Sequence, residues 1–125
     1  MFKTNFKRVG DFMTAFGQNV QMRPKLVDHD TSTLRYSLIA EELDEFGEAV
    51  EKDDLVGIAD ALTDLLYVVY GAGHAYGINL DKCFKEVHSS NMSKLGPDGT
   101  PIYREDGKVL KGPDYREPDL EKFVK

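Results

Sequence analysis

Acidic side chains at helical spacing are the residues of this sequence best suited to chemistry. Glu41, Glu42 and Glu45 lie within five positions of one another, in a run with the composition of a helix. Because residues three or four positions apart share a face of an α-helix, these carboxylates cover one sector of it, and we assign Asp44 to the solvent side. An ordinary solvated face would also explain the cluster, since glutamate is a good helix former.

A second acidic pair, Asp60 and Asp64, lies in the most apolar run of the chain, IADALTDLLYVVY. A buried carboxylate without a partner is unfavourable by several kcal/mol or takes up a proton, and few basic residues lie nearby in the sequence. A divalent cation would satisfy Glu42, Glu45 and Asp64 together, with Asp60 as a further candidate ligand. Oxygen ligands of this kind favour Mg²⁺, with Mn²⁺ as an alternative.

Two helices are predicted in the first half of the chain. The apolar residues before Gly17 recur at steps of three and four, as in an amphipathic helix. The loop that follows carries Pro24, which favours extended backbone around it. The next helix, which holds the glutamates, is predicted to begin near residues 30–32, where several side chains can cap it, and to end near Lys52.

The third predicted helix, which contains both aspartates, is apolar on nearly all sides. We expect Asp53 or Asp54 to cap it and Gly77 to end it. Such a helix is normally buried on most sides, and its short neighbours in one chain would hardly cover it. We therefore expect a homodimer or homotetramer. We assign the helix to a protein core rather than a membrane, because its first half is acidic and its length is short for a span.

The last part of the chain changes character. A fourth helix is predicted from Asn79 to about Gly96. Beyond it, alternating residues around Asp106-Gly107 predict a hairpin with a type I′ turn, followed by an extended tail. The sequence therefore predicts an all-α protein with a small C-terminal β-hairpin. Residues 1–98 would form an all-α catalytic domain, and residues 99–125 would add the hairpin and tail to the same domain.

Composition narrows the function classes. The 125 residues suggest one domain, and the net charge of -6 argues against binding to a nucleic-acid polymer, which usually requires a basic surface. The single cysteine, Cys83, excludes an intrachain disulfide framework. The N-terminal residues show neither a secretory signal nor a long uncharged apolar stretch, so we expect a cytoplasmic protein.

Taken together, the order and context of these motifs resemble the all-α nucleoside triphosphate pyrophosphohydrolases. This MazG-like group has the phosphoribosyl-ATP pyrophosphohydrolases and dimeric dUTPases as relatives. The resemblance is carried by Glu41, Glu42 and Glu45 in an EExxE pattern, and by Asp64 in TDLLYVVYG. It continues through GINLDKCFKEVHSSNMSKLGPDG and covers about residues 34–98. One departure is clear: the family's second motif is usually ExxD, and the residue three positions before Asp64 is Ala61.

The resemblance implies a fold and an activity. The fold would be a bundle of four to five helices, completed by oligomerisation. The reaction would cleave a (deoxy)nucleoside triphosphate between its α- and β-phosphates, giving the monophosphate and pyrophosphate. Mg²⁺ held by Glu42, Glu45 and Asp64 would assist it, and Asp60 could take the place of the acid missing at position 61. Glu41 would accept a proton from water or support a ligand.

The resemblance also implies substrate-binding residues. Asn91 and Lys94, three residues apart on the fourth predicted helix, would lie near the phosphates. The base pocket would use the first helix and the loop after it, including Phe16, Gln18 and Gln21. A hairpin lysine such as Lys111 could close over the phosphates, although exposed strand lysines are usually only solubilising.

Two alternatives stay open. The same fold could act on phosphoribosyl-ATP or another nucleotide-linked diphosphate. A non-catalytic helical oligomerisation or binding module is the other alternative. In that case the acids would form a solvated face. The absence of an acid at position 61 favours this alternative. Neither the base nor the sugar of a nucleotide substrate follows from the sequence.

Overall fold

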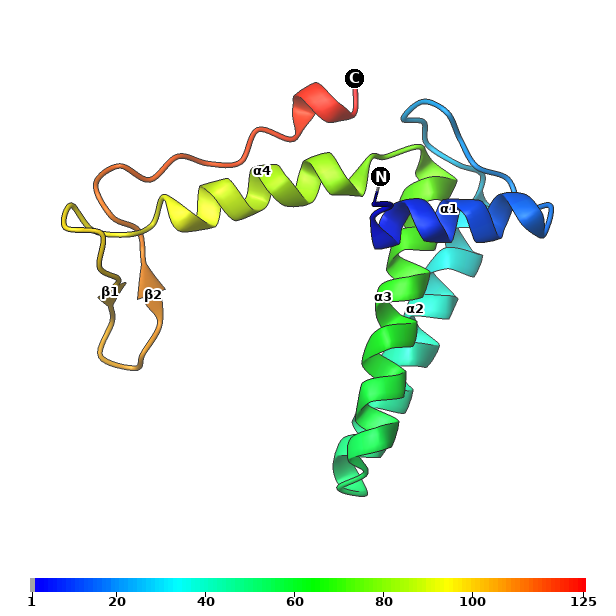
Figure 1. The fold of residues 1–125 in the computed structure, drawn as a ribbon, viewed down its shortest axis with the longest axis horizontal. Helices are drawn as coiled ribbons and strands as arrows, with labels where there is room; N and C mark the ends of the chain where they lie inside the picture. Colours follow the sequence, from blue (N-terminus) through cyan, green and yellow to red (C-terminus); the bar gives the residue numbers. More distant parts are fainter. Residues whose placement is uncertain (1) are drawn as a thin grey trace. The chain divides into compact units, whose positions relative to one another are not determined.

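Four α-helices and a short β-hairpin make up the fold in the computed structural model, which describes residues 2–125 (Figure 1). The elements are α1 (Asn5–Ala15), α2 (His29–Glu51), α3 (Leu55–Tyr76), α4 (Leu80–Met92), β1 (Ile102–Tyr103), β2 (Val109–Leu110) and a 3₁₀-helix η1 (Glu121–Phe123). The predicted all-α class with a small C-terminal hairpin is confirmed. The chain divides into two compact units, one ending at Leu80 and the other spanning Asp81–Lys125.

The long helices α2 and α3 lie side by side and run in opposite directions (Figure 1). Side chains fix where each one begins. Asp54 caps α3 as predicted, by accepting a hydrogen bond from the Gly57 amide, whereas α2 is capped by Asp28 rather than by residues 30–32. Gly77 ends α3 with a φ of 70°, a left-handed conformation that glycine adopts without strain.

Small residues on one face of α3 allow α2 to approach closely. Ala61, Gly71 and Ala75 are buried, and a Cβ added at Gly57 would lie 3.2 Å from the Cβ of Ala49 on α2. Ala61 is only 2% exposed. The position at which the family resemblance led us to look for an acid is therefore a packed alanine.

α1 packs on α3 through an apolar face and one histidine. Phe6, Val9 and Met13 are the buried residues of α1, at the spacing of one helical face. The ring of His74 on α3 stacks on Phe6 with centroids 3.9 Å apart, and its Nε2 lies 2.7 Å from the Phe6 carbonyl oxygen. Gly10 provides the space, because a Cβ there would lie 2.7 Å from the imidazole Cε1.

α3 also presents apolar side chains that this chain leaves uncovered. Leu55 and Val56 are 78% and 80% exposed, and Leu62 and Leu66 are about half exposed. By length and composition alone the helix is long and apolar enough to cross a membrane, so our expectation that it was too short was wrong. Helices buried in the cores of soluble proteins meet the same criterion. Coverage by a second subunit stays our prediction, as does the absence of a membrane partner.

The second unit holds its tail against α4 through Glu86. The Arg116 guanidinium donates to a Glu86 carboxylate oxygen at 2.7 Å, and the Asp119 amide donates to the same oxygen at 2.9 Å. The Ser90 hydroxyl donates to the Arg116 carbonyl, and the Arg116 amide donates to Ser93. The Asp119 amide and the Arg116 guanidinium lower the pKa of Glu86 to about 2.

The structure confirms the predicted hairpin in this unit but not the predicted type I′ turn. The register pairs Ile102 with Leu110 and Tyr103 with Val109. The Arg104 amide donates to the Lys108 carbonyl, which leaves a three-residue loop. A type I′ turn needs positive φ at two residues, but within residues 104–108, all of them described, only Gly107 has one. The loop therefore matches the three-residue class, with its glycine in the left-handed conformation.

Protonation of Glu86 should release the tail from α4. Because the folded pKa is depressed, this interaction contributes stability above the ordinary pKa of 4.5 and loses it as the pH falls toward about 2. Glu86→Gln should therefore speed amide exchange at Asp119 and Arg116 at neutral pH, as measured by hydrogen–deuterium exchange. Glu105→Gln, at an exposed hairpin position, is the matched control. Unchanged exchange in Glu86→Gln would mean that other contacts hold the tail.

Candidate active site

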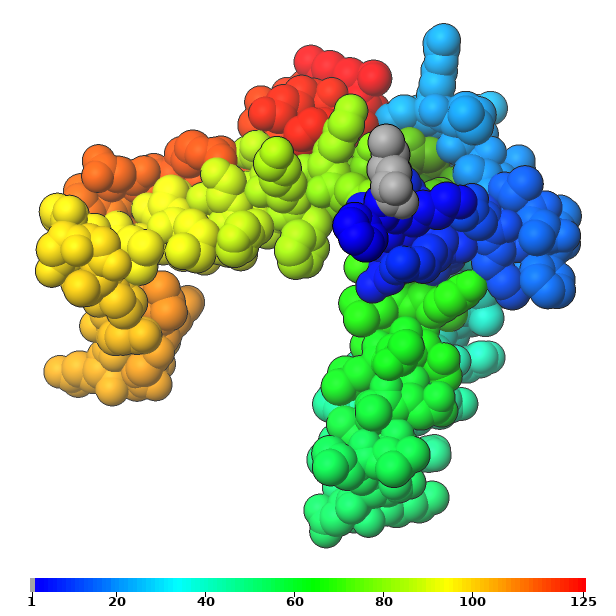
Figure 2. Space-filling model, in the orientation of Figure 1, coloured from blue at the N-terminus to red at the C-terminus, as the bar shows by residue number. Residues whose placement is uncertain are grey.

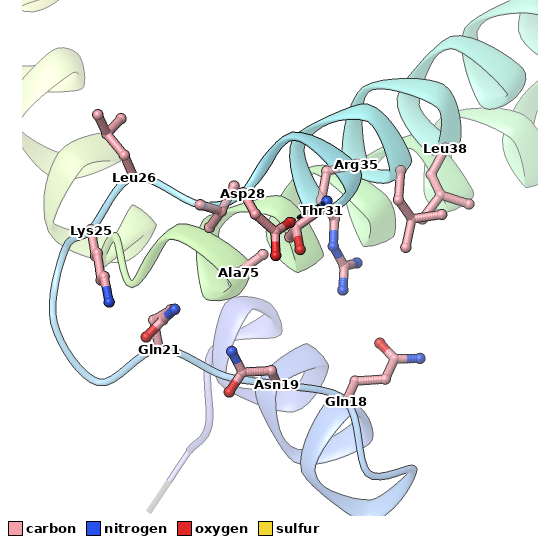
Figure 3. Close-up of a pocket in the computed structure, with 12 residues that line it drawn as sticks. Gln18, Asn19, Gln21, Lys25, Leu26, Asp28, Thr31, Arg35, Leu38 and Ala75 are labelled. Carbon is pink, nitrogen blue, oxygen red and sulfur yellow. Dashed lines mark hydrogen bonds between the residues drawn. The ribbon is translucent and has the colours of Figure 1, made fainter.

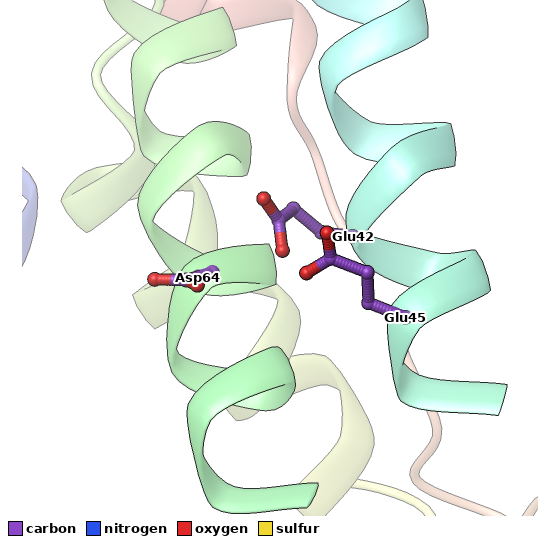
Figure 4. A group of neighbouring side chains, drawn as sticks. All are labelled: Glu42, Glu45 and Asp64. Atoms are coloured by element: carbon purple, nitrogen blue, oxygen red, sulfur yellow. The ribbon is translucent and has the colours of Figure 1, made fainter. Parts of the chain in front are cut away.

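Three acids converge between the two long helices. Glu42 and Glu45 come from α2 and Asp64 comes from α3 (Figure 4). Each offers one carboxylate oxygen, and these oxygens all lie within 4.8 Å of one another. Glu42 and Asp64 are partly buried, whereas Glu45 is exposed. The structure thus brings together the three residues that the sequence selected as the main metal ligands.

Glu42 is the electrostatic centre of this three-acid group. Burial is the largest cause that raises the pKa of Glu42, and the neighbouring carboxylates of Glu45, Asp64 and Asp60 raise it further. Its Oε2 atom is buried and has no hydrogen-bond partner among the described residues. Within residues 2–125, no lysine or arginine forms an ion pair with any of these acids.

This donor set fits a hard divalent cation. Carboxylate oxygens are the ligands that Mg²⁺ takes from proteins, and a cation would relieve both the mutual repulsion and the unpartnered oxygen of Glu42. Mg²⁺ characteristically binds through a few carboxylates and keeps its other positions for water and substrate phosphates. The three-acid group therefore has the donor atoms and spacing that could hold such a metal ion.

Two predicted acids lie outside the three-acid group. Glu41 is exposed on α2, and Asp60 is exposed on α3. Asp60 lines a small cavity of about 180 Å³ beside Ala61, together with Glu45 and Glu48. Its charge acts on Glu42, but direct ligation by Asp60 stays a prediction, as does the role of Glu41 toward water.

A larger cavity of about 700 Å³ lies at the far end of α2, between its first turns, the C-terminal end of α3 and the loop after α1 (Figure 3). Gln18 and Gln21 line it, whereas Phe16 does not, and a role of this cavity as the base pocket stays a prediction. The Gln21 amide donates to the His74 carbonyl, and the Lys25 amide donates to the Tyr76 carbonyl. These two bonds tie the loop to the end of α3 beside the cavity.

Arg35 is the residue that the sequence reasoning missed. It lines the large cavity from α2 and extends toward the loop that carries Gln18 (Figure 3). A signal for it was present, since Arg35 is the single lysine or arginine in α2 and lies seven residues before Glu42, on the same helical face.

Asn91, Lys94 and Lys111 belong to the second unit, and their contact with phosphate stays a prediction. Asn91 lies on α4, but that helix ends at Met92, so Lys94 follows the helix instead of sharing its face as we expected. The Lys94 carbonyl accepts a bond from the Gly112 amide, which ties it to the tail. The Lys111 Nζ lies 4.8 Å from the ring centroid of Tyr115, a cation–π contact.

Comparison with known proteins places the chain in a family. Residues 9–91 match the family described as phosphoribosyl-ATP pyrophosphohydrolase (PRA-PH). The chain is similar to "Uncharacterized protein L479" of Acanthamoeba polyphaga mimivirus, with 38% identity over 112 residues that cover 86% of this chain. It spans only 42% of the length of that relative.

A solved structure shares the fold. It is the crystal structure of a "putative NTP pyrophosphohydrolase" from Exiguobacterium sp. 255-15, which superposes with a TM-score of 0.56 at 28% sequence identity. The match covers 99% of this chain and 95% of that one.

Mg²⁺ should stabilise this chain through the three-acid group. A cation that binds only the folded state, at a concentration well above its dissociation constant, should raise the Tm by several degrees. Glu42→Gln and Asp64→Asn should each remove most of that increase, and Asp60→Asn should remove less. Scanning calorimetry with and without Mg²⁺ measures the effect, with exposed Asp44→Asn as control. An increase that survives in Asp64→Asn would contradict the assignment.

Proposed function

Because this chain belongs to the phosphoribosyl-ATP pyrophosphohydrolase family, we propose that it is a metal-dependent nucleoside triphosphate pyrophosphohydrolase. It would cleave a (deoxy)nucleoside triphosphate to the monophosphate and pyrophosphate, removing a surplus or non-canonical nucleotide. The observation that carries this proposal is the convergence of carboxylate oxygens of Glu42, Glu45 and Asp64 within 4.8 Å. No ion pair joins them to a basic side chain among the described residues. The name of the Exiguobacterium structure, which covers nearly the whole chain, supports it.

The three carboxylates are negatively charged, whereas a polyphosphate, which is also negative, requires positive charge at its binding site. Glu42, Glu45 and Asp64 would hold Mg²⁺ or Mn²⁺, and Asp60 is a further candidate ligand. Bound there, the cation would neutralise phosphate charge and lower the pKa of a coordinated water. The packed pair of α2 and α3 contributes positioning, because ligands on rigid helices are held more precisely than ligands on loops.

We also propose roles for the other residues that the sequence singled out. Glu41, one residue from Glu42 on α2, would accept a proton from the attacking water or orient it. The large cavity lined by Gln18 would take the base, and Asn91, Lys94 and Lys111 would contact phosphates. A second subunit, in a dimer or tetramer, would cover the exposed apolar side chains of α3. We place the protein in the cytoplasm.

One alternative substrate has specific support. The matched family is described by its action on phosphoribosyl-ATP, so that compound or another nucleotide-linked diphosphate is the second candidate. It would use the same three acids, so comparison of the two substrates decides between them. A non-catalytic helical module is less well supported, because the family description and the name of the structural relative both specify a pyrophosphohydrolase.

Pyrophosphate release tests the activity directly. With Mg²⁺ present, the protein should release pyrophosphate from at least one member of a panel of nucleoside triphosphates and phosphoribosyl-ATP. Loss of a metal ligand should lower kcat/KM by at least about 10- to 100-fold, the range found for residues that only support such ligands. Glu42→Gln and Asp64→Asn are the test variants, and Asp44→Asn is the control. Full activity in both test variants would show that the chemistry lies elsewhere.

A further inference from the structure

The Arg35 guanidinium lies in the large cavity with no acidic partner. Its Nε atom is buried and has no hydrogen-bond partner among the described residues. Burial alone lowers its pKa, and no described carboxylate forms an ion pair with it. The Nε atom is enclosed by protein, so a ligand in the cavity would bond to the Nη atoms of the same guanidinium. Buried polar groups are normally satisfied, and this guanidinium has no acidic partner among the described residues.

The packing of α3 holds the Arg35 guanidinium in place. Gly71 lies against it, and a Cβ at that position would come within 2.9 Å of the Arg35 Nη1 atom. Arg35 on α2 lies against Gly71 on α3, and Glu42 on α2 lies near Asp64 on α3. The guanidinium is thus positioned by the packing that positions the acids, and it is not a freely moving surface group.

The distance between Arg35 and the three-acid group suits a nucleotide. Arg35 and Glu42 lie seven residues apart on one face of α2, which corresponds to about 10 Å at the rise of an α-helix. This is comparable to the reach from a nucleobase to the phosphates of its own nucleotide. With phosphates at the acids, the base would lie in the cavity that contains Arg35.

The chemistry of the cavity favours particular bases. A guanidinium donates hydrogen bonds and accepts none. The neighbouring Gln18, Asn19 and Gln21 carry amides, which can donate or accept as the base requires. An exocyclic amino group facing Arg35 would place two donors opposite each other, whereas a keto oxygen would accept a hydrogen bond from the guanidinium Nη atoms. A site built around such a bond rejects bases that cannot form it.

We propose that Arg35 selects the base, by donating to a keto oxygen at position 6 of a purine or position 4 of a pyrimidine. The preferred substrates are then guanine-, hypoxanthine-, uracil- or thymine-type nucleotides, in preference to those of adenine and cytosine. This inference rests on the proposed function for its phosphate end, but the base contact itself requires neither metal nor catalysis.

Binding of nucleosides tests the base contact separately from the reaction. In EDTA, calorimetric titration should give roughly 10- to 100-fold tighter binding of deoxyguanosine and deoxyuridine than of deoxyadenosine and deoxycytidine. Arg35→Met should remove that ratio, and Arg35→Lys, which keeps the charge and most of the packing, should remove most of it. Lys7→Met, at an exposed position of α1 outside the cavity, should leave the ratio intact. Equal binding of all four nucleosides by the unmodified protein would overturn the proposal, as would a ratio that persists in Arg35→Met.

Gly71→Ala offers a second test that leaves Arg35 itself unchanged. Alanine is the better helix former by about 1 kcal/mol, so α3 should not be weakened, but the new Cβ must displace the end of the Arg35 side chain. Nucleoside binding to this variant should lose most of its keto preference, while the Mg²⁺-dependent rise in Tm persists. A preserved preference in a folded Gly71→Ala protein would contradict the assigned position of the guanidinium. Loss of the Mg²⁺ effect in the unmodified protein would instead count against the proposed function alone.

Discussion

The close packing of α2 against α3 is the constraint on which both parts of the site depend. Small side chains on α3 let the two helices approach, and this fixes which residues face each other. In that register Glu42 and Glu45 meet Asp64, and Arg35 meets Gly71. A shift of one residue along either helix would turn its side chains by about 100° and separate these groups. The positions of an acidic group and of an unpaired guanidinium therefore follow from one apolar interface.

The three-acid group and Arg35 lie along one face of α2. Together they would suit a ligand whose two ends differ in chemistry. In the proposed function, the three acids would bind a cation and, through it, phosphate oxygens. About two helical turns away, the cavity offers amides and a guanidinium, which suit the polar edge of a base. Neither feature alone distinguishes a nucleotide from other anions or from other heterocycles, and their spacing supports the proposal of a nucleotide. Phosphate contact by Asn91, Lys94 and Lys111 stays a prediction, as does coverage of the exposed apolar residues of α3 by a second subunit.

The acids could be predicted from the sequence because helical spacing alone places side chains on a face. The ends of α3 could be predicted too, since an aspartate cap and a left-handed glycine leave local signals. Other features depended on tertiary context. The cap of α2 is Asp28, one of several capping side chains in a row, and pattern alone does not rank them. In the sequence, Arg35 has the features of an ordinary exposed cation on a helix. Only the structure shows that its guanidinium packs against Gly71. Ala61 reads as a missing ligand, but the structure shows a position packed at the interface, where a larger side chain would need space.

Paramagnetic broadening by Mn²⁺ tests most directly whether the three-acid group binds a divalent cation. In an amide NMR spectrum of the whole chain, substoichiometric Mn²⁺ should broaden the signals of residues 41–46 and 61–65 first, before those around other acids such as Asp53 and Glu105. Excess Mg²⁺ should restore the signals. Broadening spread evenly over the acidic surface, or centred away from the interface between α2 and α3, would contradict this account of the site.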